Sequence, residues 1–218
     1  MSHILEADSV MLRFGDRAIL SDIYLKSETG RITGLVGNNG SGKSSLMKVI
    51  FGVLHAECKS VRVDGKYLAQ PYLVPDAVNY LPQQNFLPQT ATVNKICRQY
   101  EVSLVGFKQS FDVAIKGSDH VADLHGSTRR LLELFLLIKR PTKFTLLDEP
   151  FTHLSPILVQ QLQMLLLEEK RHKGFVLTDH NFHSLKHIAD DLYFLNNGVL
   201  KHRNDVENIE TYRSLFEL

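Results

Sequence analysis

A glycine-rich loop near the N-terminus constrains this chain more than any other sequence feature. Residues 37–44 read Gly-Asn-Asn-Gly-Ser-Gly-Lys-Ser and lie between an apolar run at 32–36 and a largely apolar one at 46–50. Glycine lets the backbone curl so that successive N–H groups point at phosphate oxygens, and the start of a following helix adds positive charge. The sequence therefore predicts a strand, a loop and a helix that bind a nucleoside triphosphate. The loop residues are Gly37, Asn38, Asn39, Gly40, Ser41, Gly42, Lys43 and Ser44.

The composition is that of an ordinary globular protein. Of its 218 residues, 44% are hydrophobic and 22% are charged, and the formal net charge is +1. That charge offers no overall attraction for nucleic acid, so we expect no nucleic-acid partner. Basic residues cluster at 139–140 and 170–173, at the ends of expected helices, where cations offset the negative end of the helix dipole.

The sequence predicts neither a signal peptide nor a membrane span. The N-terminus acquires Glu6 early, and the longest apolar run, residues 131–138, contains Glu133. That run is far shorter than the roughly 20 apolar residues that cross a bilayer. Cys58 and Cys97 lack the spacing of metal ligands, which favours a reduced compartment. We expect a cytoplasmic protein; if it works at a membrane, another subunit must supply the membrane span.

Apolar runs alternate with helical patterns over most of the chain, which predicts an α/β fold of the P-loop type with a mostly parallel core sheet. The expected core strands are 31–36, 78–81, 144–148 and 175–178. Shorter alternating runs predict an antiparallel β layer beside this core, and glycine dipeptides mark its hairpins. These runs and turns are 4–14, Gly15-Asp16, 18–26, 61–63 and Asp64-Gly65, and a separate hairpin is predicted from 192–195, Asn197-Gly198 and 199–201.

A helical insertion interrupts the expected core. Between about residues 84 and 126 the sequence becomes more polar, with helices expected at 93–100 and 102–111, and the insertion is expected to span about residues 84–140. A further helix is expected at 156–171, because Pro156 suits a helix start. We expect a single nucleotide-binding domain over residues 1–218 with this small helical subdomain inserted in it.

Two adjacent carboxylates end the apolar strand at 144–148. They are Asp148 and Glu149, and Pro150 follows them. Buried carboxylates beside a polyphosphate repel it, so they need the charge of Mg²⁺ between them. We therefore expect Asp148 to hold the metal shell and Glu149 to face the γ-phosphate.

A histidine follows the next expected strand. His180 comes just after the apolar run at 175–178. In a parallel sheet the carboxyl ends of such strands open on the same edge as the phosphate loop. We expect His180 to reach the γ-phosphate, and the alternative is a structural strand-end histidine.

The order of these motifs resembles the ATP-binding cassette (ABC) ATPases, the nucleotide-binding subunits of ABC transporters, over essentially the whole chain. That order is phosphate loop, glutamine after a strand, signature loop, Asp-Glu-Pro and strand-end histidine. The resemblance implies that Lys43, Ser44 and Ser45 bind phosphates and Mg²⁺, and that Asp148 belongs to the metal shell.

The same resemblance assigns four further residues. It implies that Glu149 is the general base for water, that His180 is the switch histidine and that Gln83 touches the metal. Gln84 is the competing assignment for the glutamine. Phe14 stands where the family places an aromatic ring that stacks on adenine, and the alternative is that it packs inside the β layer.

The signature loop departs from the family consensus of Leu-Ser-Gly-Gly-Gln or Leu-Ser-Gly-Gly-Glu. In the family this loop caps the γ-phosphate held by the opposite subunit, so we expect weaker or slower closure here. Ser155 also stands where an aspartate is usual in the dimer-contacting loop. The five signature positions are Leu124, His125, Gly126, Ser127 and Thr128.

The resemblance implies an ATP-binding and ATP-hydrolysing subunit that uses ATP and Mg²⁺ and powers an ABC transporter through dimer closure. Its implied partners are a second ABC ATPase subunit, in a homodimer or a heterodimer, and integral membrane permease subunits that hold it at the inner face of a membrane. The alternatives are a non-hydrolysing or weakly hydrolysing regulatory clamp, a soluble non-transport ABC ATPase and a P-loop small-molecule kinase.

Overall fold

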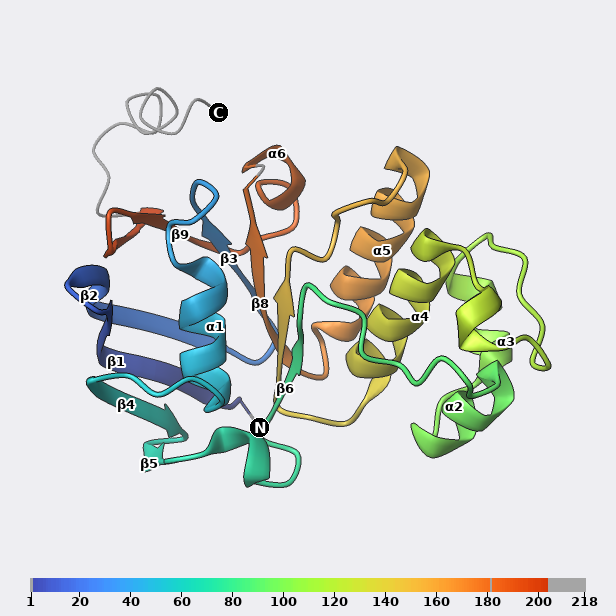
Figure 1. Ribbon diagram of the computed structural model, residues 1–218, viewed down its shortest axis with the longest axis horizontal. Helices are drawn as coiled ribbons and strands as arrows, with labels where there is room; N and C mark the ends of the chain where they lie inside the picture. The colour runs from blue at the N-terminus through green and yellow to red at the C-terminus, as the bar shows by residue number, and fades with distance from the viewer. Residues whose placement is uncertain (1, 181, 204–218) are drawn as a thin grey trace.

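Two β-sheets and a group of helices at one end make up the structure (Figure 1). The computed structural model describes residues 2–180 and 182–203. The larger sheet has the order β10-β9-β3-β8-β7-β6, with β3 (Ile32–Val36), β6 (Val78–Leu81), β7 (Phe144–Asp148), β8 (Gly174–Asp179), β9 (Asp191–Asn196) and β10 (Val199–His202). The smaller sheet has the order β2-β1-β4-β5, with β1 (Ile4–Phe14), β2 (Arg17–Glu28), β4 (Cys58–Val63) and β5 (Lys66–Tyr67).

The larger sheet is parallel from β9 to β6, and β10 returns antiparallel to β9. Every residue of β3, β7 and β8 is buried, because helices or the second sheet cover both faces. The smaller sheet is antiparallel throughout. The predicted fold class, a mostly parallel core with an antiparallel β layer, is confirmed.

The hairpin turns fall where the sequence predicts them. Gly15, Asp64, Gly65, Asn197 and Gly198 all have positive φ angles, of 58°, 55°, 75°, 48° and 77°. Glycine adopts this conformation without strain, and Asn and Asp tolerate it better than other residues. These turns fix the register of the strands that they join.

The helices form two groups. Residues of α1 share a hydrophobic core with β1, β2 and β4, so α1 lies between the two sheets. α4 and α5 pack on the other face of the larger sheet, and α2 and α3 lie beyond them at one end (Figure 1). The helices are α1 (Lys43–Phe51), α2 (Val93–Gln99), α3 (Leu104–Ser110), α4 (Gly126–Lys139), α5 (Pro156–Glu169) and α6 (Phe182–Leu185), with 3₁₀ turns at Pro71–Leu73 and Val121–Asp123.

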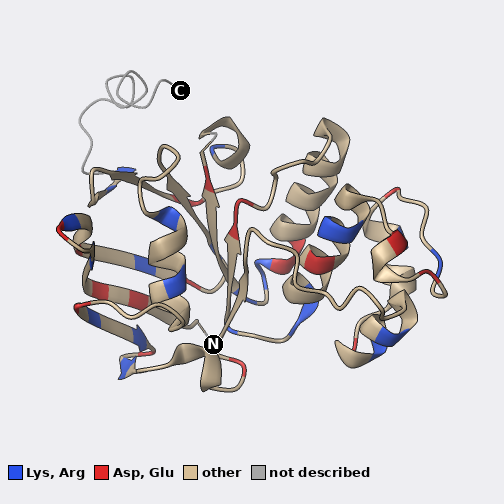
Figure 2. Cartoon of the chain, in the orientation of Figure 1, with Lys and Arg blue, Asp and Glu red and all other residues tan. Residues whose placement is uncertain are grey.

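The segment expected to form a helical insertion, residues 84–140, contains α2, α3 and α4. Among the described residues, no helix is both long and apolar enough to cross a membrane. Acidic and basic residues are interspersed along the chain in the view of Figure 2.

The expectation that the basic run at 170–173 caps its own helix is wrong for its last residue. Lys173 is only 2% exposed, and its ammonium group donates to the carbonyl of Arg140, the residue that ends α4. Lys173 therefore caps a neighbouring helix from inside the core.

Candidate functional site

The phosphate loop has the backbone that its glycines allow. Gly40 and Gly42 have φ angles of 78° and 106°, which are strained for other residues. A Cβ atom on Gly37 would lie 2.4 Å from the carbonyl oxygen of Leu195, so no larger residue fits there. α1 starts directly after the loop, and no side chain caps its N-terminus. Its first N–H groups are therefore available to an anion.

Lys43 is folded into this loop. Its Nζ donates to the carbonyl oxygens of Gly37 at 2.6 Å and Asn38 at 3.0 Å. Burial lowers the pKa of Lys43, and the charges of nearby carboxylates oppose that shift. Ser41 Oγ is buried beside it with no hydrogen-bond partner among the described residues. A buried hydroxyl without a partner and a preoriented ammonium group both suit a bound phosphate.

Oxygen-bearing side chains meet at the start of α1. Ser44 Oγ donates to Asp148 Oδ1 at 3.1 Å, and Gln83 Nε2 donates to Ser44 Oγ at 3.2 Å. Thr178 Oγ1 donates to the same Asp148 oxygen at 2.7 Å, and the Tyr80 hydroxyl donates to Oδ2 at 3.1 Å. A hydroxyl, a carboxylate and an amide oxygen are the ligands that Mg²⁺ prefers, so this group fits the ion.

The position of Gln83 favours it over Gln84 as the glutamine of the site. The segment that follows β6 and carries Gln83 is here called the glutamine loop. Gln83 contacts Ser44 and lines two cavities, one with the phosphate loop and one with the signature residues, whereas Gln84 lines neither. Burial, together with the Asp148 carboxylate, raises the pKa of Tyr80 well above its ordinary value. Tyr80 therefore stays a neutral hydrogen-bond donor to Asp148.

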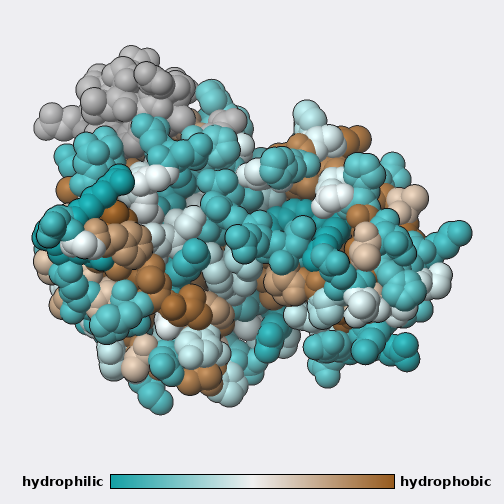
Figure 3. Space-filling view, in the orientation of Figure 1, coloured by the Kyte–Doolittle hydropathy of each residue, from teal (hydrophilic) through white to brown (hydrophobic). Residues whose placement is uncertain are grey.

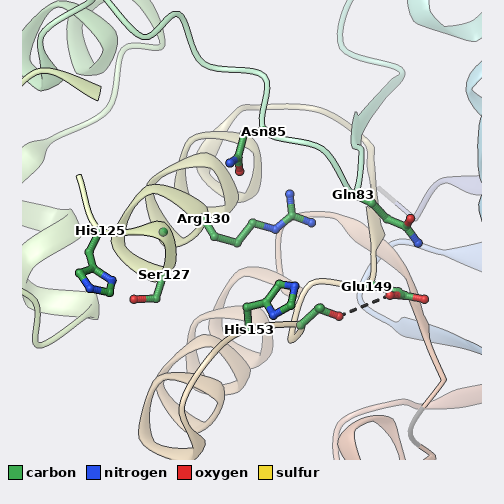
Figure 4. Close-up of a pocket in the computed structure, with 9 residues that line it drawn as sticks. Gln83, Asn85, His125, Ser127, Arg130, Glu149 and His153 are labelled. Atoms are coloured by element: carbon green, nitrogen blue, oxygen red, sulfur yellow. Dashed lines mark hydrogen bonds between the residues drawn. The ribbon is translucent and has the colours of Figure 1, made fainter. Parts of the chain in front are cut away.

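Glu149 leaves the end of β7 in a left-handed backbone conformation with a φ of 48°. Its amide donates to Thr178 Oγ1 at 2.9 Å, which holds this conformation. Its carboxylate accepts a hydrogen bond from Thr152 at 3.4 Å, drawn as the dashed line in Figure 4. His180 Nδ1 lies 3.9 Å from Glu149 Oε1 and 3.6 Å from Asp179 Oδ1, and its side chain is half-exposed. The two strand ends thus bring Glu149 and His180 together.

A cavity of about 550 Å³ joins this group to the end of the β1–β2 hairpin. Phe14 lines it together with the phosphate loop, and 54% of its surface is exposed. This exposure is evidence against the alternative that Phe14 packs the β layer. Arg17, paired with Phe14 across the hairpin, lines the same cavity and was not identified from the sequence. The signal for it was present, since the first residue after the two-residue turn Gly15-Asp16 lies directly opposite Phe14 on the paired strand.

The signature positions lie at the start of α4, beside a second cavity of about 590 Å³ (Figure 4). His125, Gly126 and Ser127 line it, whereas Leu124 packs against the core and Thr128 is buried. A Cβ atom on Gly126 would meet nothing within 4 Å, so the chain itself does not require a glycine there. The cavity is lined by Gln83, Asn85, His125, Gly126, Ser127, Arg130, Glu149, Thr152 and His153.

A buried ionic group behind this cavity was also not identified from the sequence. Arg129 and Arg130 lie 3.6 Å from the carboxylate of Glu133, which is fully buried. The spacing of these residues, three and four apart on one helix, was a readable signal. Glu133 therefore has a structural role within the apolar run, as the ion-pair partner of two arginines.

Comparison with known proteins places these features in one family. Residues 20–152 match the family described as "ABC transporter". The galactose/methyl galactoside import ATP-binding protein MglA of Fusobacterium nucleatum is 26% identical over 97% of this chain and 46% of its own length. The lipopolysaccharide export system ATP-binding protein LptB of Haemophilus influenzae is 25% identical over 90% of this chain and 88% of its own length. This chain thus spans about half of the first relative and most of the second.

Solved structures show the same fold. The ATP-binding subunit of an ABC transporter superposes with a TM-score of 0.80 at 20% identity, over 99% of this chain and 94% of that one. A bacterial Atm1-family ABC exporter with ATP bound gives a TM-score of 0.82 at 17% identity, over 99% of this chain and 42% of that one.

Proposed function

Because this chain belongs to the ABC transporter family, whose ATP-binding subunits are ATPases, we propose that it powers transport by binding and hydrolysing ATP as two such subunits close on each other. The observation that carries this proposal is the convergence of Lys43, Ser44, Gln83, Asp148 and Glu149 around one cavity. The whole of residues 1–218 acts as one cassette, with residues 84–140 as its helical subdomain.

The phosphate loop binds the phosphates, and the oxygen-bearing side chains bind the metal ion. The N–H groups of the loop and the ammonium group of Lys43 hold the phosphates, with Ser45 following on the first turn of α1. Ser44, Asp148 and Gln83 would hold Mg²⁺, which when bound offsets the negative charge of the phosphates. Phe14 provides the aromatic face for the adenine ring.

Glu149 and His180 carry the hydrolytic step. The Glu149 carboxylate takes the proton of the attacking water. The Thr152 hydroxyl donates to this carboxylate and the Glu149 amide donates to Thr178 Oγ1, and the two bonds keep the residue oriented. His180, at the end of the neighbouring strand, stabilises charge on the γ-phosphate. A non-hydrolysing clamp would need neither residue, so the clamp alternative is not favoured.

The exposed signature residues act on a second subunit. His125, Gly126 and Ser127 line the second cavity, where the γ-phosphate of a partner ATPase subunit would be capped. Replacement of a serine by His125 and of a glycine by Ser127 weakens this closure in a homodimer. In a heterodimer the partner supplies a better signature to this chain's ATP.

An apolar surface supports a membrane-bound partner. Tyr72, Leu73 and Val74 are 40%, 62% and 38% exposed. Figure 3 shows apolar residues, in brown, gathered in the left half of that view. Tyr72 packs on Phe51 with ring centroids 5.7 Å apart, and Phe51 packs on Tyr80 just before the glutamine loop. Permease subunits docked here would hold the chain at the inner face of a membrane.

An assay of phosphate release from Mg-ATP tests this function. It is run on the purified wild-type chain and on the Glu149→Gln variant, each with and without candidate permease subunits. Steady release by the wild type that the substitution abolishes supports the proposal. Binding of ATP with no release by the wild type under either condition would instead favour the regulatory clamp.

A further inference from the structure

One guanidinium group joins the two loops that carry the catalytic glutamine and the catalytic glutamate. Arg130 Nη1 donates to the carbonyl oxygen of Pro82 at 2.8 Å, and Nη2 donates to that of Asp148 at 3.1 Å. These carbonyls belong to the peptide bonds that immediately precede Gln83 and Glu149. Arg130 therefore holds both functional residues through their backbone.

The hydrogen bonds of Arg130 lie just beyond the point where β6 and β7 stop pairing. The ladder between β6 and β7 ends with the pair of Leu81 and Leu147. Pro82, the next residue, has no N–H group with which to extend the ladder. The two strands would separate here, and the planar fork of Arg130 bridges them one residue further on.

The same arginine connects this bridge to α4. Glu133, fully buried, lies 3.6 Å from Arg130 Nη1, and its Oε1 accepts hydrogen bonds from the amides of Phe86 and Leu87 at 3.0 and 3.4 Å. Arg130 lies one turn beyond Gly126, at which α4 begins. The signature end of α4 and the two catalytic loops therefore share one buried network.

Moving the Arg130 and Glu133 side chains away from their partners costs free energy. The side chain of Arg130 is 9% exposed and that of Glu133 is fully buried, so their charges cannot be compensated by water. Charge-assisted hydrogen bonds to two carbonyls fix the guanidinium plane in one orientation. A rotation of α4 must therefore move Pro82 and Asp148 together or leave buried groups without partners.

We propose that Arg130 is a positioning residue, which sets the placement of Gln83 relative to Glu149 and links both to the signature end of α4. Its effect on hydrolysis rests on the proposed function, whereas its effect on the two loops does not. Closure of the signature loop on a partner's nucleotide would reach the chain's own catalytic residues through this single side chain.

Arg129 offers a matched control. It lies next to Arg130 on α4, its Nη2 donates to the carbonyl of Leu87 at 2.9 Å, and its Nε lies 3.6 Å from Glu133. Its hydrogen bond reaches the glutamine loop but not the loop of Glu149. If Arg130 is only part of a structural ion pair, substitutions of the two arginines should change the exchange rates of the two loops in the same way. If Arg130 is a positioning residue, only its substitution should affect the loop of Glu149.

Hydrogen exchange separates these cases without relying on activity. In Arg130→Lys, which keeps the charge beside Glu133, we expect amides in both 82–88 and 147–153 to exchange on the order of fivefold faster. In Arg129→Lys only the first segment should change. Unchanged exchange at 147–153 in Arg130→Lys, or equal changes in the two variants, would overturn the proposal. If the lysine variant does not fold, Arg130→Gln, in which Glu133 keeps Arg129 as its ion-pair partner, is measured in the same way.

Kinetics provide the second measurement. Arg130→Lys should lower kcat on the order of tenfold with little change in KM, because misplaced catalytic groups slow chemistry rather than binding. Arg129→Lys should stay within about threefold of the wild type. A rise in KM with unchanged kcat would contradict positioning. A wild type without phosphate release would refute the proposed function, while the exchange pattern would still decide the role of Arg130.

Discussion

Ser44 donates a hydrogen bond of 3.1 Å to Asp148, although 104 residues separate them in the chain. The bond joins the first turn of α1 to the carboxyl end of β7 and orients two side chains that we propose as ligands of Mg²⁺. Thr178 fixes the same carboxylate from the neighbouring strand β8. The site is thus preorganised by three elements that the parallel sheet brings to one edge.

Glu149→Gln should bind ATP but barely hydrolyse it. A general base contributes roughly 10²–10⁴-fold to rate, so we expect phosphate release to fall at least about 100-fold. The amide keeps the size of the side chain and its contact with Thr152, so ATP affinity should stay within about threefold. Nucleotide titration and a phosphate-release assay measure the two quantities. Glu168→Gln, on the exposed side of α5, is the control. A Glu149→Gln variant with most of the wild-type rate would remove Glu149 as the base.

Lys43→Ala should lose most ATP binding. The substitution removes a buried ammonium group that the carbonyls of Gly37 and Asn38 already hold in place. We expect the Kd for Mg-ATP to rise on the order of 100-fold, as for loss of a charge-assisted hydrogen bond. Lys48→Ala, exposed on the same helix, should bind like the wild type. Equal affinities in isothermal titration would refute the phosphate-loop assignment.

The elements of this site that are local in sequence could be predicted, and those that depend on packing could not. The phosphate loop follows from glycine conformations, and the meeting of Asp148, Glu149 and His180 follows from the shared edge of parallel strands. The bridge from Arg130 depends on where α4 crosses the strand ends, which no local pattern encodes. Lys173 shows the same limit, because its position in a basic run indicates a helix end but not which helix it caps.

Phe14→Ala should weaken binding of ATP but not of inorganic triphosphate. The exposed ring lines the nucleotide cavity beside the phosphate loop, and stacking of a base on an aromatic ring contributes roughly 1–3 kcal/mol. We expect a 5- to 100-fold rise in the Kd for ATP, to be measured by titration calorimetry. Met11→Ala, an exposed apolar residue on the same strand, is the control. Equal losses for both ligands would mean that Phe14 acts on the loop rather than on the base.

Restoring the signature consensus should strengthen closure. In a Glu149→Gln background, His125→Ser with Ser127→Gly restores a small hydroxyl donor and a close backbone where a facing phosphate would lie. We expect light scattering with Mg-ATP to show a larger dimer fraction than in Glu149→Gln alone. A dimer that is already complete without these changes would show that the natural loop closes fully as a homodimer. A monomer in both cases that still binds ATP would point to a different partner cassette.

The buried Lys173 should make stability rise with pH. Burial lowers its pKa from 10.5 to about 8, so between these values the unfolded chain holds a proton that the folded chain has lost. The free energy of unfolding therefore increases with pH over this window and is independent of this group below it. Lys173→Met lacks this contribution, so the stability of the variant relative to the wild type should decline by up to ~3 kcal/mol from about pH 7 to about pH 10.5.

Urea denaturation at a series of pH values measures this difference. The test is the change with pH and not the offset, because methionine also leaves the carbonyl of Arg140 without its donor. Subtracting the two curves cancels other groups that titrate in the range, such as the buried tyrosines. Lys66→Met, on the exposed strand β5, is the control for loss of a surface lysine. A difference for Lys173→Met that does not vary with pH would mean that Lys173 keeps an ordinary pKa despite its burial.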